Sequence, residues 1–259
     1  MTLSNQIKFV FLLLTFQLLA GCDDQNDITQ NGLVYCIEAS PSSFNPQTAA
    51  STATLDATTS ELYNRLLYVD PNTQQFQPGL ATKWQISKDR LSYRFQLRRG
   101  VKFHTTAYFT PSREFNADDV IFSFGSIIDS KHPFYDITKS GYPFFEGIDF
   151  ASQVVQLNKL NDYEIEFKLA SPDSSFIANL ASEFSIILSA EYADTLQKMA
   201  KPADIAKRPI GTGPFKFKQY RTDNFIRYQK NPDYWGKSSP MEQLVLDITP
   251  NASSRLAKL

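Results

Sequence analysis

The structural pattern of the sequence is clearest at residues 93–98, YRFQLR, and at residues 116–124, NADDVIFSF. The first stretch alternates apolar and polar residues, as the two faces of a half-buried strand require. In the second stretch, the Asn116 side chain is suited to accept the first free backbone amides of a helix, and Asp118 and Asp119 favour its positive end. We therefore predict a strand followed by a capped helix that contains the apolar run 120–124.

The same reasoning extends in both directions along the chain. Residues 163–169, YEIEFKL, repeat the alternation of a strand, and residues 221–224, RTDN, separate two alternating runs as a hairpin turn does. Strands are predicted at 33–37, 93–98, 163–169, 215–218, 225–228 and 244–248, and further helices at 53–68, 172–182 and 191–199. Strands and helices in this order indicate a mixed α/β (α+β) fold class rather than a bundle or a sandwich.

The composition disfavours several functional classes. The chain has 259 residues, with 26 Lys and Arg against 27 Asp and Glu, so it has no basic excess with which to bind nucleic acid. It contains no run of 18 apolar residues that would predict a transmembrane helix. The motifs GxSxG, HExxH and GxxxxGKS/T are absent, and two His and two Cys cannot supply a zinc-finger spacing. We expect no catalytic residue, no metal and no cofactor.

The first 22 residues have the pattern of a secretory signal peptide. Lys8 precedes an apolar run over 9–19 that is too short to span a bilayer. The run ends in LAGC at 19–22, which resembles a bacterial lipobox, so Cys22 is predicted to become the lipidated first residue of the mature protein. The alternative is an ordinary signal peptide that contains a cysteine. Residues 23–30 are predicted to form a polar tether, and Asp23 fits either a signal for retention in the inner membrane or the start of that tether.

The second cysteine, Cys36, lies in LVYCI at 33–37, which we interpret as a buried strand. In an oxidising compartment Cys36 has no partner in this sequence once Cys22 is lipidated. Either its thiol is free and buried, or its partner lies beyond Leu259. Residues 250–259, PNASSRLAKL, begin like a Ser-capped helix and contain no C-cap glycine, so we expect the sequence to be truncated.

Three groups of residues admit both a chemical and a structural interpretation. The carboxylates of Asp118 and Asp119 resemble a catalytic dyad, but adjacent helix positions point in different directions, which favours a capping role. Residues 211–214, GTGP, lack the lysine of a phosphate-binding loop, so we predict a turn. His104 and His132 have no carboxylate or thiol at ligand spacing, so we expect them to bind no metal.

Five stretches together resemble the bacterial extracellular solute-binding proteins of family 5, which are the periplasmic components of peptide ABC importers. These stretches are SFNP at 43–46, FQLRRGVKFH at 95–104, FNADDVIFS at 115–123, GTGPF at 211–215 and NPDYWG at 231–236. The resemblance covers 31–259 in the order of the family. Residues 110–116 and 169–176 are similar to the branch that includes SapA-type proteins, which bind antimicrobial peptides and haem. The branch of dipeptide-binding proteins resembles the sequence almost as closely.

The resemblance implies a periplasmic binding protein of type II, in which two lobes close on an extended peptide without a chemical step. Members of the family are longer chains, of which this sequence resembles only the N-terminal half. It therefore implies that 31–259 hold lobe I with an inserted subdomain at roughly 70–200, and that most of lobe II lies beyond residue 259, together with the acidic anchor for the peptide amine. In some relatives a cysteine just beyond the equivalent of Leu259 is bonded to the one that matches Cys36.

The resemblance also points to a ligand-binding loop. In relatives the loop after the first strand lines the cleft, and in this sequence the matching residues are Glu38, Ala39, Ser40, Pro41, Ser42, Ser43 and Phe44. An extended peptide held mainly by backbone hydrogen bonds needs only such small hydroxyls and backbone groups. The alternative is a plain surface turn in which Glu38 is a solvated carboxylate.

The leading hypothesis is a monomeric, lipid-anchored subunit that captures peptides, antimicrobial peptides included, in the periplasm of a Gram-negative bacterium and delivers them to ABC permeases in the inner membrane. A second hypothesis within the family is binding of haem or another non-peptide solute. A secreted hydrolase is disfavoured because no nucleophile–base motif is present. A structural envelope lipoprotein would show no saturable binding of a small ligand.

Overall fold

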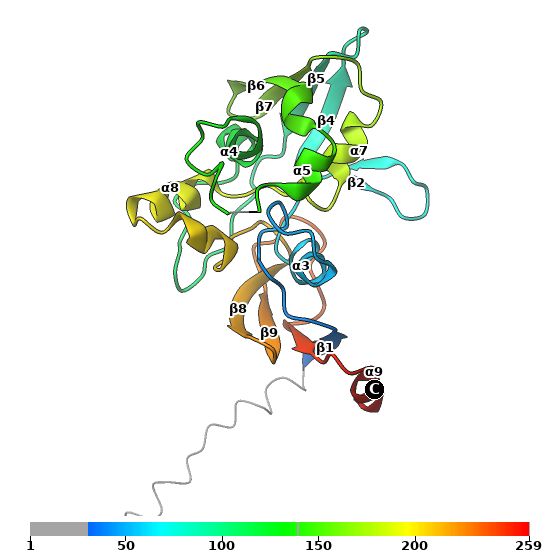
Figure 1. The fold of residues 1–259 in the computed structure, drawn as a ribbon, viewed down its shortest axis with the longest axis vertical. Helices are drawn as coiled ribbons and strands as arrows, with labels where there is room; N and C mark the ends of the chain where they lie inside the picture. The colour runs from blue at the N-terminus through cyan, green and yellow to red at the C-terminus, as the bar shows by residue number, and fades with distance from the viewer. Residues whose placement is uncertain (1–30, 139, 259) are drawn as a thin grey trace, which may run out of the picture.

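The described chain folds around two separate four-stranded β-sheets, with a small two-stranded sheet and helices between and beside them (Figure 1). The structure is a computed structural model that describes residues 31–138 and 140–258. The predicted signal peptide over 1–22, its lipidation site Cys22 and the tether over 23–30 lie outside the described residues. In the part of the chain that the structure describes, no helix has both the length and the apolar character needed to cross a membrane.

The first sheet joins the beginning and the end of the described chain. Its strands lie in the order β1 (Gly32–Ile37), β10 (Gln243–Ile248), β9 (Phe225–Lys230) and β8 (Phe215–Arg221). β1 runs parallel to β10, and the other neighbours are antiparallel. The predicted hairpin is confirmed as β8–β9, and Asp223 in its turn adopts a left-handed φ of 58°, which Asp tolerates better than most residues.

The second sheet is antiparallel throughout. Its strands lie in the order β4 (Ala81–Ile86), β5 (Ser92–Leu97), β7 (Glu164–Leu169) and β6 (Val154–Asn161), so the predicted strands 93–98 and 163–169 are confirmed. Phe95 and Phe167 meet edge to face, and Phe124 of α4 (Ala117–Ile128) lies 5.3 Å from the Phe167 ring centre. The apolar half of the alternating pattern therefore forms the core under α4. This sheet falls within the predicted insertion over 70–200, whose boundaries stay a prediction.

Short elements complete the fold. They are α3 (Thr52–Thr58), the hairpin β2 (Leu67–Val69) and β3 (Phe76–Pro78), α5 (Pro143–Gly147), α6 (Phe150–Gln153), α7 (Phe176–Ala181), α8 (Ala190–Lys198), the 3₁₀ helix η2 (Pro202–Ala206) and α9 (Ala252–Ala257). α8 confirms the helix predicted over 191–199. α9 confirms the helix predicted near the last residues, although its cap is Asn251, whose side chain accepts from Ser254 N–H at 3.0 Å, and not a serine.

The helix predicted over 53–68 is wrong beyond Thr58. α3 ends there, and residues 61–66 form an irregular segment whose backbone groups pair with two distant parts of the chain. The Leu62 carbonyl accepts from Gly213 N–H, and the Arg65 carbonyl accepts from Leu80 N–H, both at 2.9 Å. Leucines at helical spacing, such as Leu62, are fully buried here because other elements surround the segment on all sides.

The helix predicted over 172–182 starts too early. α7 begins at Phe176, and the preceding residues form a turn in which the Asp173 carboxylate accepts from Ser175 N–H at 2.8 Å. Asp side chains commonly bond the backbone two residues ahead in this way, which offers the chain an alternative to a helical turn. The Ser-Pro-Asp sequence at 171–173 is therefore a turn signal and not a helix start.

Asp119 holds the start of α4 against two other segments. Its fully buried carboxylate accepts two hydrogen bonds from the Arg113 guanidinium, at 2.7 and 2.8 Å, and one from Asn116 N–H at 2.9 Å. A further bond comes from Ala190 N–H of α8, also at 2.9 Å. With Asn116 it forms a reciprocal capping box, so the predicted capping role is confirmed and the dyad interpretation is wrong.

Replacing Asp119 tests this assignment. Asp119→Asn places a buried amide group against the Arg113 donors and leaves the partly buried guanidinium without its counter-charge, so we expect the free energy of unfolding to fall by about 3 kcal/mol. Urea denaturation monitored by circular dichroism measures the change. The matched control is Asp118→Asn, whose half-exposed carboxylate pairs with Lys159 and whose loss should change stability by about 0.5 kcal/mol or less. Equal effects of the two substitutions would contradict the assignment.

Candidate functional site

The first half of the predicted ligand-binding loop lies at the surface. Glu38 accepts a hydrogen bond from the Arg255 guanidinium of α9 at 2.9 Å and remains 79% exposed. Ser40 Oγ donates to the Asp223 carboxylate at 2.7 Å and accepts from Asp223 N–H at 2.9 Å, so the loop is fixed to the β8–β9 turn. Ala39 and Ser42 are exposed, whereas Pro41 is buried. The structure therefore presents the loop at one end of the first sheet.

The second half of the loop turns into the core. Ser43 Oγ accepts from Asn45 N–H at 2.9 Å. Phe44 is 3% exposed, its ring lies edge-on to Phe217 and Tyr220 at 5.1 and 5.3 Å, and its carbonyl accepts from the Tyr63 hydroxyl. In this structure the Phe44 ring anchors the loop to β8 and is not available to a solute at the surface.

Strand β1 differs from its prediction in exposure. The sequence predicted a buried strand, but Leu33, Val34 and Tyr35 are 44%, 49% and 56% exposed. The reason is that β1 is the edge strand of its sheet and pairs only with β10 among the described strands. Cys36 on this strand is partly exposed and free, so the interpretation of a buried thiol is wrong.

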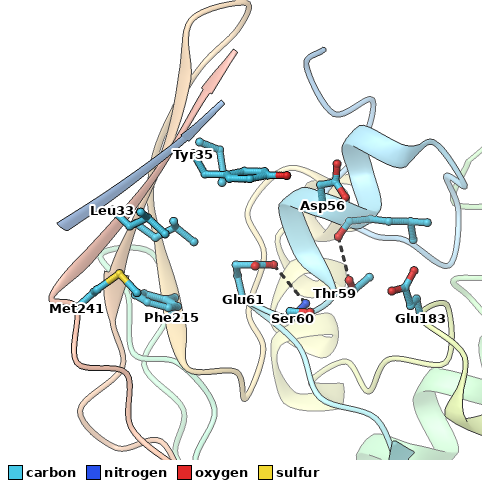
Figure 2. A pocket seen from close by; sticks show the side chains of 12 residues that line it. Leu33, Tyr35, Asp56, Thr59, Ser60, Glu61, Glu183, Phe215 and Met241 are labelled. Atoms are coloured by element: carbon cyan, nitrogen blue, oxygen red, sulfur yellow. Dashed lines mark hydrogen bonds between the residues drawn. The ribbon is translucent and has the colours of Figure 1, made fainter. Parts of the chain in front are cut away.

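A cavity of about 420 Å³ lies between this sheet and α3, and Figure 2 shows its lining. The sheet contributes an apolar wall that includes Leu33, Tyr35 and Phe215, and Met241 closes one end. The opposite wall is acidic and contains Asp56 of α3, Glu61, and Glu183 after α7. Sequence reasoning missed this cavity because Glu61 was placed inside a predicted helix. Leu33 and Tyr35 are two residues apart, so their side chains lie on the same face of β1. This spacing was the available signal that one face of the strand is apolar.

Glu61 is the most perturbed carboxyl group of the cavity. Burial, with a smaller contribution from the nearby carboxylates of Asp56 and Glu183, raises its pKa to about 7, although the backbone amides of Glu61 and Ser60 oppose the shift. The Ser60 N–H donates to the Glu61 carboxylate at 3.3 Å. Among the described residues no cationic group lies within 4.0 Å of these three carboxylates. The cavity thus has an apolar wall on one side and three carboxyl groups on the other.

The turn at 211–214 is packed against the segment 61–64. A Cβ atom on Gly211 would lie 1.9 Å from the Leu62 carbonyl oxygen, and one on Gly213 would lie 2.4 Å from that of Glu61. Only glycine permits this approach, which allows the Gly213 N–H to bond Leu62. The predicted turn is confirmed, and with its Gly213 amide in use it does not present the open amides of a phosphate-binding loop.

His104 fixes the other side of this turn. Its backbone N–H donates to the Gly211 carbonyl at 2.9 Å, and its Nδ1 accepts from Gly211 N–H at 3.3 Å, so its Nε2–H donates to the Gly213 carbonyl at 2.9 Å. Burial lowers its pKa to about 4, so the ring is neutral at neutral pH. At His132 the Nδ1 accepts from Phe134 N–H at 3.2 Å. In the described ranges no group of three or more His, Cys, Asp or Glu is arranged to hold a metal ion.

Asn64 joins the turn to the rest of the fold. Its Oδ1 accepts from the Thr212 hydroxyl and from Trp235 Nε1, both at 2.9 Å. Its Nδ2 donates to the Tyr68 hydroxyl at 2.6 Å, and its carbonyl accepts from Ile187 N–H. No hydroxyl or thiol of the described residues is hydrogen-bonded to either histidine ring. The hydrogen bonds of His104, His132 and Asn64 described here therefore have structural roles, and neither histidine ring activates a nucleophile among the described residues.

Comparison with known proteins places this arrangement in context. Residues 75–259 match the family model described as bacterial extracellular solute-binding proteins, family 5, middle. Heme-binding protein A of Haemophilus influenzae is 40% identical over 93% of this chain and 46% of its own length. The peptide transport periplasmic protein SapA of Salmonella typhimurium is 39% identical over 100% of this chain and 48% of its own length. The chain thus spans about half the length of these curated relatives.

Among solved structures, the dipeptide-binding protein of Pseudoalteromonas sp. SM9913 in complex with Met-Leu superposes with a TM-score of 0.86 at 47% identity. The match covers 88% of this chain and 45% of that protein. The fold described above is therefore that of one part of a solute-binding protein, in agreement with the predicted fold class.

The role of His104 is tested by its pH dependence. His104→Ala leaves the Gly211 amide unpaired, so we expect the free energy of unfolding at pH 7 to fall by about 3 kcal/mol. Because the folded-state pKa is depressed, the unfolded wild-type chain takes up a proton between pH 6.5 and about 4 that the folded chain does not. The difference between wild type and variant should therefore shrink, by about 2 kcal/mol at most, between pH 7 and pH 5.

Urea denaturation at the two pH values gives this difference, with Ser42→Ala as a control that should change stability at neither pH. A pH-independent difference for His104→Ala would show that the ring is not held neutral by burial.

Proposed function

Because the chain belongs to the bacterial extracellular solute-binding proteins of family 5, we propose that it is part of the peptide-binding subunit of an ABC importer. The observation that carries this proposal is the 47% identity and TM-score of 0.86 to a dipeptide-binding protein that holds Met-Leu. We further propose that the whole protein captures peptides, antimicrobial peptides included, as a monomer in the periplasm and delivers them to permeases in the inner membrane.

The loop after β1 supports the assignment of a peptide site. Glu38, Ala39, Ser40 and Ser42 lie at or near the surface beside the β8–β9 turn, with backbone groups and small side chains suited to an extended peptide. We assign Phe44 to positioning this loop, because its ring is buried against Phe217. In this proposal Pro41 and Ser43 stiffen the loop between its exposed and buried ends.

Haem is the second candidate solute, favoured by the similarity to heme-binding protein A. Iron in haem is commonly held by an axial imidazole. The sequence has two histidines, and the ring nitrogens of His104 are both hydrogen-bonded inside the protein. His132 also uses Nδ1 to accept a backbone amide. These bonds leave this part of the chain without a well-placed histidine ligand and favour peptide over haem.

The two cysteines complete the proposal. Cys22 is proposed as the lipidated first residue, with Asp23 either as a retention signal for the inner membrane or as the start of the tether. Cys36 lies partly exposed on the edge strand β1, so a cysteine on a polypeptide that follows residue 259 could reach its thiol without opening the core. The disulfide stays a proposal that rests on the family resemblance.

Isothermal titration calorimetry on a full-length form tests the solute. We expect saturable binding of Met-Leu and no saturable binding of haemin; the reverse result would assign the protein to haem. The isolated 259-residue chain should bind Met-Leu at least 100-fold more weakly, because a clamp holds its ligand between two lobes.

Ser42→Trp should weaken binding in the full-length form at least tenfold, whereas the exposed control Ser130→Trp should not.

Cell fractionation tests the anchor. Cys22→Ser removes the only thiol at the predicted processing site, so we expect the protein to move from the membrane pellet to the soluble periplasmic fraction and to lose incorporation of labelled palmitate. Cys36→Ser is the matched control and should leave both properties unchanged. A Cys22→Ser protein that still pellets and incorporates palmitate would rule out lipidation at this residue.

A further inference from the structure

Another cavity, of about 200 Å³, lies among α4, α5, α6 and the loop that joins α4 to α5. Its floor is apolar, because Ile127 of α4, Phe145 of α5 and Phe150 of α6 line it and are buried in the core. The loop adds the partly buried Tyr135 and the buried Tyr142, whose hydroxyl donates to a backbone carbonyl of the loop at 2.8 Å. Four aromatic residues therefore line this space, which we call the α5 cavity.

The exposed part of this lining carries two carboxyl groups, those of Glu146 and Asp149. The Glu146 carboxylate is held in place by the Tyr142 N–H, which donates to it at 2.9 Å. Asp149 directly precedes α6 but makes no capping hydrogen bond with its side chain, which is the usual role of Asp at that position. Among the described residues no Lys, Arg or His nitrogen lies within 4.0 Å of either carboxylate. The α5 cavity thus combines an aromatic floor with two carboxylates that have no cationic partner in this part of the chain.

This combination selects one class of ligand. Aromatic rings attract cations to their faces, and carboxylates form charge-assisted hydrogen bonds with N–H donors, so both features favour a positively charged ligand. A hard metal ion such as Ca²⁺ needs oxygen ligands on all sides, and the apolar floor supplies none. An organic ammonium ion can instead place its alkyl groups on the floor and its N–H groups at the carboxylates. Because a cavity of about 150 Å³ accommodates one benzene molecule, the size of the α5 cavity also suits a small amine.

We propose that the α5 cavity binds the ammonium group of a small organic amine. Glu146 and Asp149 pair with its charge, and the aromatic floor contacts its alkyl part. The helices α4 and α5 belong to the half of the molecule that holds the second sheet, whereas β1 lies toward the opposite end (Figure 1). The amine site is therefore separate from the loop after β1, and it does not depend on which solute the whole protein binds.

Ligand-detected NMR titration of the 259-residue chain with n-butylammonium chloride tests the proposal. We expect saturable binding with a Kd of about 1 mM, because a ligand of this size buries few atoms. The neutral analogue 1-butanol has the same alkyl chain without the charge, and we expect it to bind at least tenfold more weakly. Absence of saturable binding of n-butylammonium, or equal binding of 1-butanol, would overturn the proposal.

Conservative charge variants locate the site. Asp149→Asn removes the charge but keeps a residue type that tolerates the left-handed φ of 52° at this position, and Glu146→Gln keeps an oxygen for the Tyr142 N–H. We expect each variant to weaken binding of n-butylammonium at least threefold and the double variant at least tenfold. The matched control is Asp56→Asn, which removes an exposed acid from the cavity beside α3 and should leave the affinity unchanged. Unchanged affinity in the double variant, or an equal loss in Asp56→Asn, would show that the amine binds elsewhere.

A pair of variants at Tyr135 tests the aromatic part of the site. Tyr135→Phe keeps the ring, so we expect the affinity for n-butylammonium to stay within twofold of wild type, whereas Tyr135→Leu should lower it at least threefold. Circular dichroism spectra of every variant separate loss of binding from loss of the fold. Equal affinities of the Phe and Leu variants would contradict the role of the ring.

A lysine derivative distinguishes a free amine from a polypeptide as the source of the ammonium group. Nα-acetyl-lysine methylamide carries the same butylammonium group on a blocked backbone. We expect it to bind no more tightly than n-butylammonium, because a cavity of about 200 Å³ leaves the backbone atoms outside. Binding of the lysine derivative at least tenfold more tightly would show that the α5 cavity recognises a polypeptide and would overturn the assignment to a small amine.

Discussion

The segment from Glu61 to Leu66 passes between the two sheets, and its backbone groups are bonded on both sides. Gly213 and Phe215 donate to the Leu62 and Glu61 carbonyls from the first sheet, while Leu80 and Gly79 donate to Arg65 and Leu66 ahead of the second. The close approach that this requires is possible because positions 211 and 213 lack a Cβ atom. His104 and Asn64 add side-chain hydrogen bonds to Gly213 and Thr212, so the two sheets are connected by a hydrogen-bonded joint and not by a loose linker.

This joint explains which parts of the fold could be predicted from the sequence. The strands β5 and β7 and the helix α4 were predictable because local alternation and a capping box determine them, and each packs one face onto one core. Residues 61–66 were not predictable, because their conformation is imposed by backbone partners outside the segment, at residues 79–80 and at residues 213 and 215. The leucine spacing in this segment also imitates that of a helix. β1 was placed correctly, but its exposure was not, since an apolar run does not say whether a strand is central or at an edge.

The candidate site, like the fold, was only partly predictable from the sequence. The loop Glu38–Phe44 was predicted as a ligand site from the family resemblance and stays a prediction. The structure separates it into an exposed end beside the β8–β9 turn and a buried end at Phe44. The cavity between the first sheet and α3 was missed, because the raised pKa of Glu61 comes from its burial and from Asp56 and Glu183, which only the tertiary fold brings together.

The parallel pairing of β1 with β10 has a consequence for how the protein is made. Gly32 and Gln243 are register partners although more than 200 residues separate them along the chain. Closing a loop of this length costs more entropy than closing a hairpin, so we expect the first sheet to form later than the local hairpins of the second. Among the described strands, β1 therefore has no partner until residues 243–248 have been synthesised, so the first sheet cannot be completed while the chain is still short.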